Sequence, residues 1–110
     1  WQNDADYKRW VSFMDKYYPH GDKSDIYNAW GPSNAATVVK VLKQCGDDLT
    51  RENVMRQAAN LHHLELPMLL PGIAISTSPT DFAPIKQVQM ERFEGERFHR
   101  FGPILSSAIG

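Results

Sequence analysis

His62, His63 and Glu65 form the densest group of side chains in the sequence that could bind a metal ion. Imidazole and carboxylate groups are common zinc ligands, but they must converge on one point. Adjacent residues point to different faces of the backbone, so the two imidazoles diverge, and no further ligand follows at helical spacing. We therefore predict no metal site and no other bound cofactor.

Residues that could carry out catalysis are also sparse. Asp47, Asp48 and Glu52 precede a predicted helix, where the positive end of the helix dipole favours negative charge. His20 and His99 stand alone and are predicted to lie on the surface. We find no carboxylate pair suited to acid–base catalysis, no nucleophile elbow and no glycine-rich phosphate loop in the sequence. We expect no catalytic residue, and hence a protein that is not an enzyme.

The aromatic residues Tyr27 and Trp30 stand at the start of a helical pattern. Aromatic walls with few polar groups suit small amphipathic ligands. Residues three apart also share one face of a helix, so the two rings could equally pack as a pair in the core. The residue types alone leave both interpretations open.

The overall composition narrows the range of partners. The chain has 110 residues with 12 basic and 13 acidic side chains, for a net charge of -1. This balance provides no basic surface for nucleic acid or anionic lipid, so we expect no nucleic-acid partner. No apolar run approaches the roughly 20 residues that span a membrane. Cys45 is the only cysteine, so an internal disulfide is excluded.

Apolar residues at helical spacing fill the first half of the chain. A break at Gly31-Pro32 favours a new helix start, because a first-turn proline needs no amide donor; a kinked continuous helix is the alternative. Ser24 and Thr50 are predicted N-caps, and Gly46 is a predicted C-cap. The predicted helices cover residues 4–18, 25–30, 32–45 and 50 to 61 or 62.

Shorter extended segments follow in the second half. We expect an apolar loop over 64–71, a short strand over 72–76, and a β-hairpin whose strands cover 85–93 and 97–101 around a turn at Glu94-Gly95. Residues 77–84, which we call the connector, contain Pro79 and Pro84. Proline disfavours helical backbone in the residue before it, so the connector is predicted to be stiff and extended.

These elements do not make a complete fold. The predicted second helix is apolar well beyond one stripe, which indicates burial on more than one side. A sheet would be its natural cover, yet the sequence offers one short strand and a hairpin with poorly sorted faces. Either the chain associates with a partner, or it is a fragment. The apolar positions of that helix are Ala35, Ala36, Val38, Val39, Val41 and Leu42.

Four segments, taken together, resemble the C-terminal portion of bacterial ABC-transporter substrate-binding proteins of the branched-chain amino-acid or leucine-binding type. The resemblance runs from Tyr7 to Ile104, in the same order and with similar spacings. The segments are K-Q-C-G-D-D-L-T-R-E-N-V-M (43–55), L-E-L-P-M-L-L-P-G-I (64–73), S-T-S-P-T-D-F-A-P-I-K-Q-V-Q (76–89) and R-F-E-G-E-R-F (92–98).

The resemblance implies an α/β chain that is a C-terminal fragment of a two-lobed, type I periplasmic-binding-protein-like fold. Residues 1–78 would complete the N-terminal lobe, residues 79–85 would form the interlobe crossover, and residues 86–110 would form a C-terminal hairpin and tail. The hairpin would pack on the second lobe. In this chain by itself, we predict that the hairpin packs on a neighbouring copy.

The resemblance also implies site residues. Trp30, Tyr27 and Asn28 would line the ligand, although family members commonly carry another aromatic residue at the position of Pro32. The hinge for lobe closure would comprise Thr80, Asp81, Phe82, Ala83 and Pro84.

By the same resemblance, the function would be solute binding in the periplasm. The protein would capture a branched-chain amino acid or a related small carboxylate and deliver it to an inner-membrane ABC permease. The alternative is a free-standing sensor or interaction domain of the same fold, without transport, that is stabilised as a homodimer.

Overall fold

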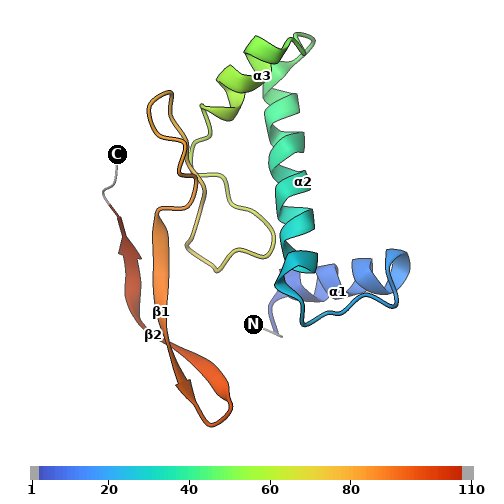
Figure 1. The fold of residues 1–110 in the computed structure, drawn as a ribbon, viewed down its shortest axis with the longest axis vertical. Coiled ribbons are helices and arrows are strands. Elements are labelled where there is room, and N and C mark those ends of the chain that lie inside the picture. The colour runs from blue at the N-terminus through green and yellow to red at the C-terminus, as the bar shows by residue number, and fades with distance from the viewer. Residues whose placement is uncertain (1–2, 108–110) are drawn as a thin grey trace.

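The computed structural model describes residues 3–107 and has a mixed α/β architecture (Figure 1). The long helix α2 is central: α1 lies across its N-terminal end, and α3 packs near its C-terminal end. An irregular segment over 59–86 leads from α3 to a two-stranded antiparallel sheet. The elements are α1 (Ala5–Tyr17), α2 (Ile26–Cys45), α3 (Arg51–Ala58), β1 (Gln87–Glu94) and β2 (Arg97–Ser106).

Helix α1 forms where its apolar spacing predicts. The Asp4 carboxylate caps it by accepting the Asp6 amide at 2.7 Å. Trp10 and Met14, one helical turn apart, are buried against Ala29 of α2. This apolar contact joins the first two helices.

Helix α2 runs unbroken through Gly31-Pro32, so the predicted new start at Pro32 is wrong and the continuous helix is correct. Proline removes the amide that would bond to the carbonyl oxygen of Asn28. The indole Nε1 of Trp10 donates to that oxygen at 3.0 Å and takes the place of the missing amide. Gly31 lacks the Cβ that proline would otherwise crowd. The N-cap is Asp25, not Ser24.

Helix α3 begins at its predicted cap but ends earlier than predicted. The Thr50 side chain accepts the Asn53 amide at 3.4 Å. The helix stops at Ala58 because Thr77, from the connector, bonds to the backbone of Ala58 and Leu61. Contacts distant in sequence therefore replace the last helical turn.

The predicted strand over 72–76 is reduced to single bridges. Ile75 pairs with Leu64 on one side and with Ile85 on the other, each as an isolated bridge. The Ser76 amide donates to the Pro84 carbonyl oxygen at 3.0 Å, but proline has no amide to return. The ladder cannot continue past that point.

The β-hairpin is present and longer than predicted, because β2 reaches Ser106. Its two-residue turn is Gly95-Glu96, one residue later than predicted, and both residues have positive φ (55° and 72°), as a type I′ turn requires. An irregularity in the register between Gln89 and Met90 leaves Gly102 and Pro103 as extra residues in β2.

The hydrophobic core consists of two small clusters at either end of α2. One is built on Trp10, Met14 and Ala29; the other comprises Val41, Cys45, Leu61 and Ile75. No hydrophobic side chain in the described part of the chain is fully buried, because each cluster is too small to enclose its members.

Among the described residues, no helix is long and apolar enough to cross a membrane.

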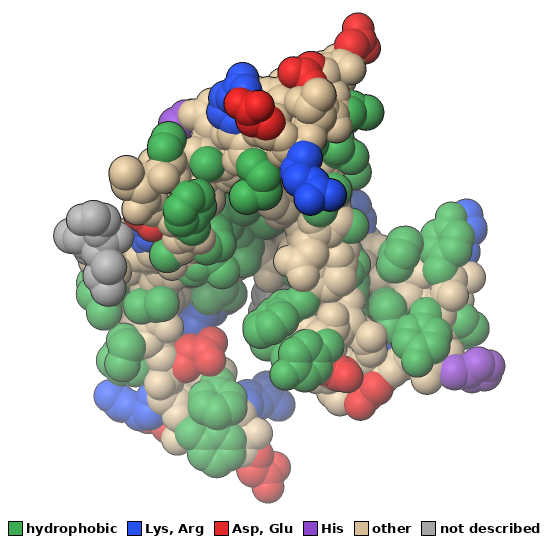
Figure 2. All heavy atoms as spheres, turned by 45° about the horizontal axis from the view of Figure 1, so that its top comes forward, with side chains coloured by type: hydrophobic (Ala, Val, Ile, Leu, Met, Phe, Trp, Pro, Cys, Tyr) green, Lys and Arg blue, Asp and Glu red, His purple; other side chains and the backbone are tan. Residues whose placement is uncertain are grey.

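The chain is more open than a compact monomer of its size. Its accessible surface is 8344 Å², whereas a compact monomer of 12.5 kDa exposes about 6,200 Å². The radius of gyration is 16.2 Å, against about 13 Å for a compact chain of this length. Figure 2 shows a hollow between the hairpin and the helices, with hydrophobic side chains around it.

Candidate functional site

A groove of about 560 Å³ lies between α2 and the chain from the end of α3 through the irregular segment that follows it. Within the described residues its lining contains no charged side chain. It is lined by Trp30, Ser33, Asn34, Thr37 and Val41 of α2 and by Ala58, Leu61, Leu66, Met68, Leu69, Ile75, Thr77, Pro84 and Ile85. Such a groove suits an apolar or uncharged group.

Trp30 is the aromatic residue that lines this groove. Its side chain is 53% exposed, and it meets the ring of Tyr27 edge to face with the ring centroids 5.4 Å apart. Tyr27 is 70% exposed and does not line the groove. The two rings therefore pack on each other, as one interpretation of their spacing predicted, but outside the core.

Asn28 takes part in holding the start of α2 together. Its side-chain amide donates to the Asp22 carbonyl oxygen at 2.8 Å, and its own carbonyl oxygen accepts from Trp10. The structure thus brings Tyr27 and Trp30 into contact and gives the Asn28 amide nitrogen a structural bond. Its role in ligand binding stays a prediction.

Sequence reasoning missed the polar residues that line the groove along α2 after Trp30. Ser33 donates to the Pro67 carbonyl oxygen at 2.6 Å and so fastens the 66–69 loop to α2. Thr37 donates to the Ser33 carbonyl oxygen at 2.9 Å. Asn34 lines the groove with an exposed side chain. Three polar residues follow Trp30 by three, four and seven positions, namely Ser33, Asn34 and Thr37. This helical spacing was the signal that could have found them.

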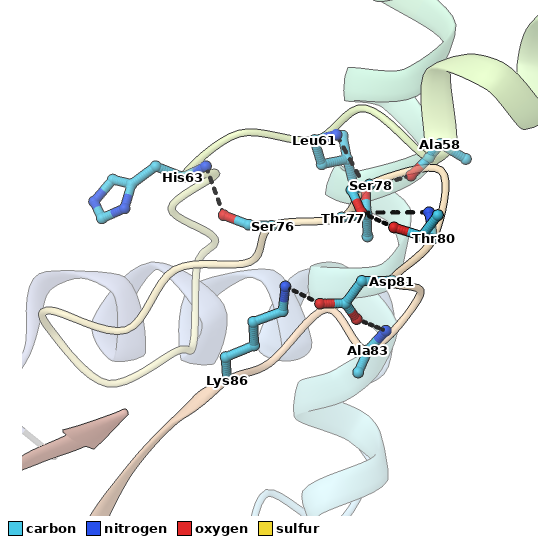
Figure 3. Close-up of polar contacts among 10 residues, drawn as sticks. All are labelled: Ala58, Leu61, His63, Ser76, Thr77, Ser78, Thr80, Asp81, Ala83 and Lys86. Atoms are coloured by element: carbon cyan, nitrogen blue, oxygen red, sulfur yellow. Dashed lines mark hydrogen bonds and ion pairs between the residues drawn. The ribbon is translucent and has the colours of Figure 1, made fainter. Parts of the chain in front are cut away.

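The first two of the predicted hinge residues, Thr80 and Asp81, belong to a turn, so the prediction that the connector is extended is wrong at this point (Figure 3). The chain reverses between Ser78 and Asp81, whose backbones exchange hydrogen bonds of 2.9 and 3.2 Å. Pro79 suits this turn because its fixed φ matches the second position of common β-turns.

The Asp81 carboxylate organises the end of this turn. It pairs with the Lys86 ammonium and accepts the Ala83 amide at 3.0 Å. Hydrogen bonding from Lys86 first, and from the Ala83 amide second, lowers the pKa of Asp81 below its ordinary value of 3.8. Asp81 is therefore ionised throughout the neutral and mildly acidic range.

The two adjacent histidines make different contacts. His62 Nε2 lies 2.8 Å from the Asn60 side-chain oxygen, whereas the His63 backbone amide donates to Ser76 Oγ at 3.0 Å. Among the described residues, no three His, Cys, Asp or Glu side chains gather closely enough to hold a metal ion.

Comparisons of this chain with protein-family models, with curated proteins and with solved structures find no match. The family resemblance of the sequence therefore stays a prediction.

Proposed function

We propose that this chain is the C-terminal portion of a two-lobed solute-binding protein and that its groove contributes one wall of the solute site. The observation that carries the proposal is the lining of the groove, to which both Trp30 and Pro84 contribute although they are far apart in the sequence. The predicted ligand wall and the predicted hinge thus border the same space, as a receptor that closes on its ligand requires.

The chemistry of the lining supports a small solute with an apolar side chain. Ten of the fourteen lining residues are apolar, and the other four carry uncharged polar groups. Charged groups of the solute would be bound by the other lobe. A branched-chain amino acid or a related small carboxylate fits this description, with delivery in the periplasm to an inner-membrane ABC permease.

The proposed mechanism involves no reaction. Ligand contacts that form only when the lobes close would shift the population toward the closed form. The aromatic ring of Trp30 would supply apolar contact area, and the connector would accommodate the change in angle between the lobes.

Titration of the intact two-lobed protein with leucine, isoleucine and valine tests the proposal, because the second lobe would be needed to bind the charged groups of the solute. Thermal stability and intrinsic fluorescence are the readouts. We expect Trp30→Ala to weaken binding by roughly tenfold or more, since burial of an aromatic side chain stabilises by about 1.5–3 kcal/mol. Tyr17→Ala, which removes another exposed aromatic residue on α1, is the matched control. Absence of binding, or equal binding by the Trp30 variant, would contradict the proposal for this groove.

A second candidate is a free-standing sensor or interaction domain that works as a homodimer. It is supported by the open shape of the chain, which exposes about 2,100 Å² more than a compact monomer of its mass. A two-fold dimer that covered this excess on both copies would bury about 4,200 Å², within the range of permanent dimers. Light scattering during size-exclusion chromatography distinguishes a stable dimer from a monomer.

A further inference from the structure

The connector starts at a residue that is bonded to the helical part of the chain (Figure 3). The Thr77 hydroxyl donates to the Ala58 carbonyl oxygen at 2.6 Å and accepts the Leu61 amide at 3.0 Å. The Thr77 amide also donates to the Leu61 carbonyl oxygen at 2.9 Å. These three bonds fix the start of the connector to the last residue of α3 and to Leu61, which follows the helix.

The connector also ends close to where it starts. The Ser76 amide reaches the Pro84 carbonyl oxygen at 3.0 Å, and the chain reverses between Ser78 and Asp81. An extended segment of this length would span roughly 26 Å. The connector is therefore folded into a closed loop that could become much longer.

Lys86 links this loop to the base of both hairpin strands. It directly precedes β1, and its carbonyl oxygen accepts the amide of Ser107, which directly follows β2, at 2.8 Å. Its ammonium pairs with Asp81. The side chains of Asp81 and Lys86 are only 13% and 31% exposed, so solvent ions screen this pair less than an open surface pair.

We propose that the Asp81–Lys86 ion pair is a latch that keeps the connector folded, and that its release opens the connector while the helices stay in place. Thr77 stays bonded to α3 in both forms. The latch concerns the chain without solute and thus goes beyond the proposed function.

Hydrogen exchange on the full chain, without solute, tests the latch. In Lys86→Met, which keeps the apolar part of the side chain, we expect the bonded amides of Ser78, Asp81 and Ala83 to exchange about two- to fivefold faster, as for the loss of a partly exposed ion pair. Amides within α2 should exchange at the wild-type rate. Lys86→Arg keeps the charge and should keep the protection.

Lys23→Met is the matched control, because it breaks an ion pair with Asp15 elsewhere in the chain. It should leave exchange in the connector unchanged. Unchanged connector exchange in Lys86→Met would overturn the latch. Faster exchange throughout α2 would overturn it as well, since the pair would then support the whole fold. Neither outcome depends on whether Trp30→Ala changes solute binding.

Discussion

At the scale of single residues, the bond from Trp10 to the Asn28 carbonyl oxygen determines the course of α2. Without it, Pro32 would leave that oxygen with no helical partner beside the buried cluster of Trp10, Met14 and Ala29. An unsatisfied polar group at a protected site costs about 1–3 kcal/mol. One indole thus offsets the effect of proline inside a helix.

A double-mutant cycle measures this compensation. Trp10→Phe should lower the free energy of unfolding by about 1–3 kcal/mol for the lost bond, with a further loss from reduced packing. In a Pro32→Ala background the amide of residue 32 can bond to Asn28, so the same Trp10 change should cost less. Urea unfolding gives the four free energies. Equal costs in both backgrounds would show that the indole bond does not replace the missing amide.

A second residue-scale prediction concerns acid stability. The Asp48 carboxylate accepts the Thr50 hydroxyl at 2.7 Å and the Thr50 amide at 3.1 Å, and these bonds lower the pKa of Asp48. Its stabilising effect is present above the ordinary carboxyl pKa of 3.8 and is lost as pH falls through the lower, folded-state value. Asp22 behaves in the same way, because its pKa is lowered by its bonds from Ser24.

We therefore expect the urea concentration at the unfolding midpoint of the wild type to decrease when the pH is lowered from about 6 to about 2.5. Asp48→Asn should be less stable at the higher pH and should show a smaller fall. Asp47→Asn, which removes a neighbouring charge, is the matched control. A fall in Asp48→Asn as large as in the wild type would contradict the assigned role of Asp48.

At the scale of elements, local signals predicted boundaries that depend on neighbouring residues and missed those that depend on distant contacts. The Thr50 cap and the hairpin follow from residues close together in sequence, so they were predictable. The end of α3 depends on Thr77, and the continuity of α2 depends on Trp10, 18 residues before Asn28. Folding brings α2 and Pro84 to the same groove. The sequence therefore indicated the wall of the groove at Trp30 but not the wall that Pro84 contributes.

The hairpin turn carries strain that one substitution should relieve. Glu96 adopts a φ of 72°, where a side chain is disfavoured and glycine is not. Glu96→Gly should stabilise the hairpin by about 1 kcal/mol and slow exchange of the cross-strand amides about fivefold. Glu94→Gly, within β1, should have the opposite effect, because glycine weakens a strand. Faster exchange in Glu96→Gly would argue against the positive φ.

At the scale of the whole molecule, one face of the hairpin is turned away from the rest of the chain, and this face is apolar near the connector and charged near the turn. The opposite face contacts the chain, since the Ala74 amide donates to the Gln87 side chain at 3.2 Å and Ile104 lies against Gly72. The outward face carries two cross-strand pairs, each residue being about half exposed. These are Val88 with Leu105 and Met90 with Phe101.

If the chain self-associates through this face, a charge at its centre should prevent it. We expect the wild type to form dimers in light scattering at tens of micromolar and Met90→Lys to be a monomer. Phe93→Lys introduces the same charge on the opposite face and should remain a dimer. A monomeric wild type, or equal effects of the two substitutions, would rule out this surface.

The unbroken course of α2 also fixes the distance between the two apolar clusters. Ala29 belongs to one apolar cluster and Val41 to the other, and a straight helix holds them about 18 Å apart. The clusters therefore cannot approach each other or separate while α2 is intact. Two probes along α2 would therefore stay at a fixed distance from each other. The distance from either of them to a third probe on the hairpin would change when the connector opens.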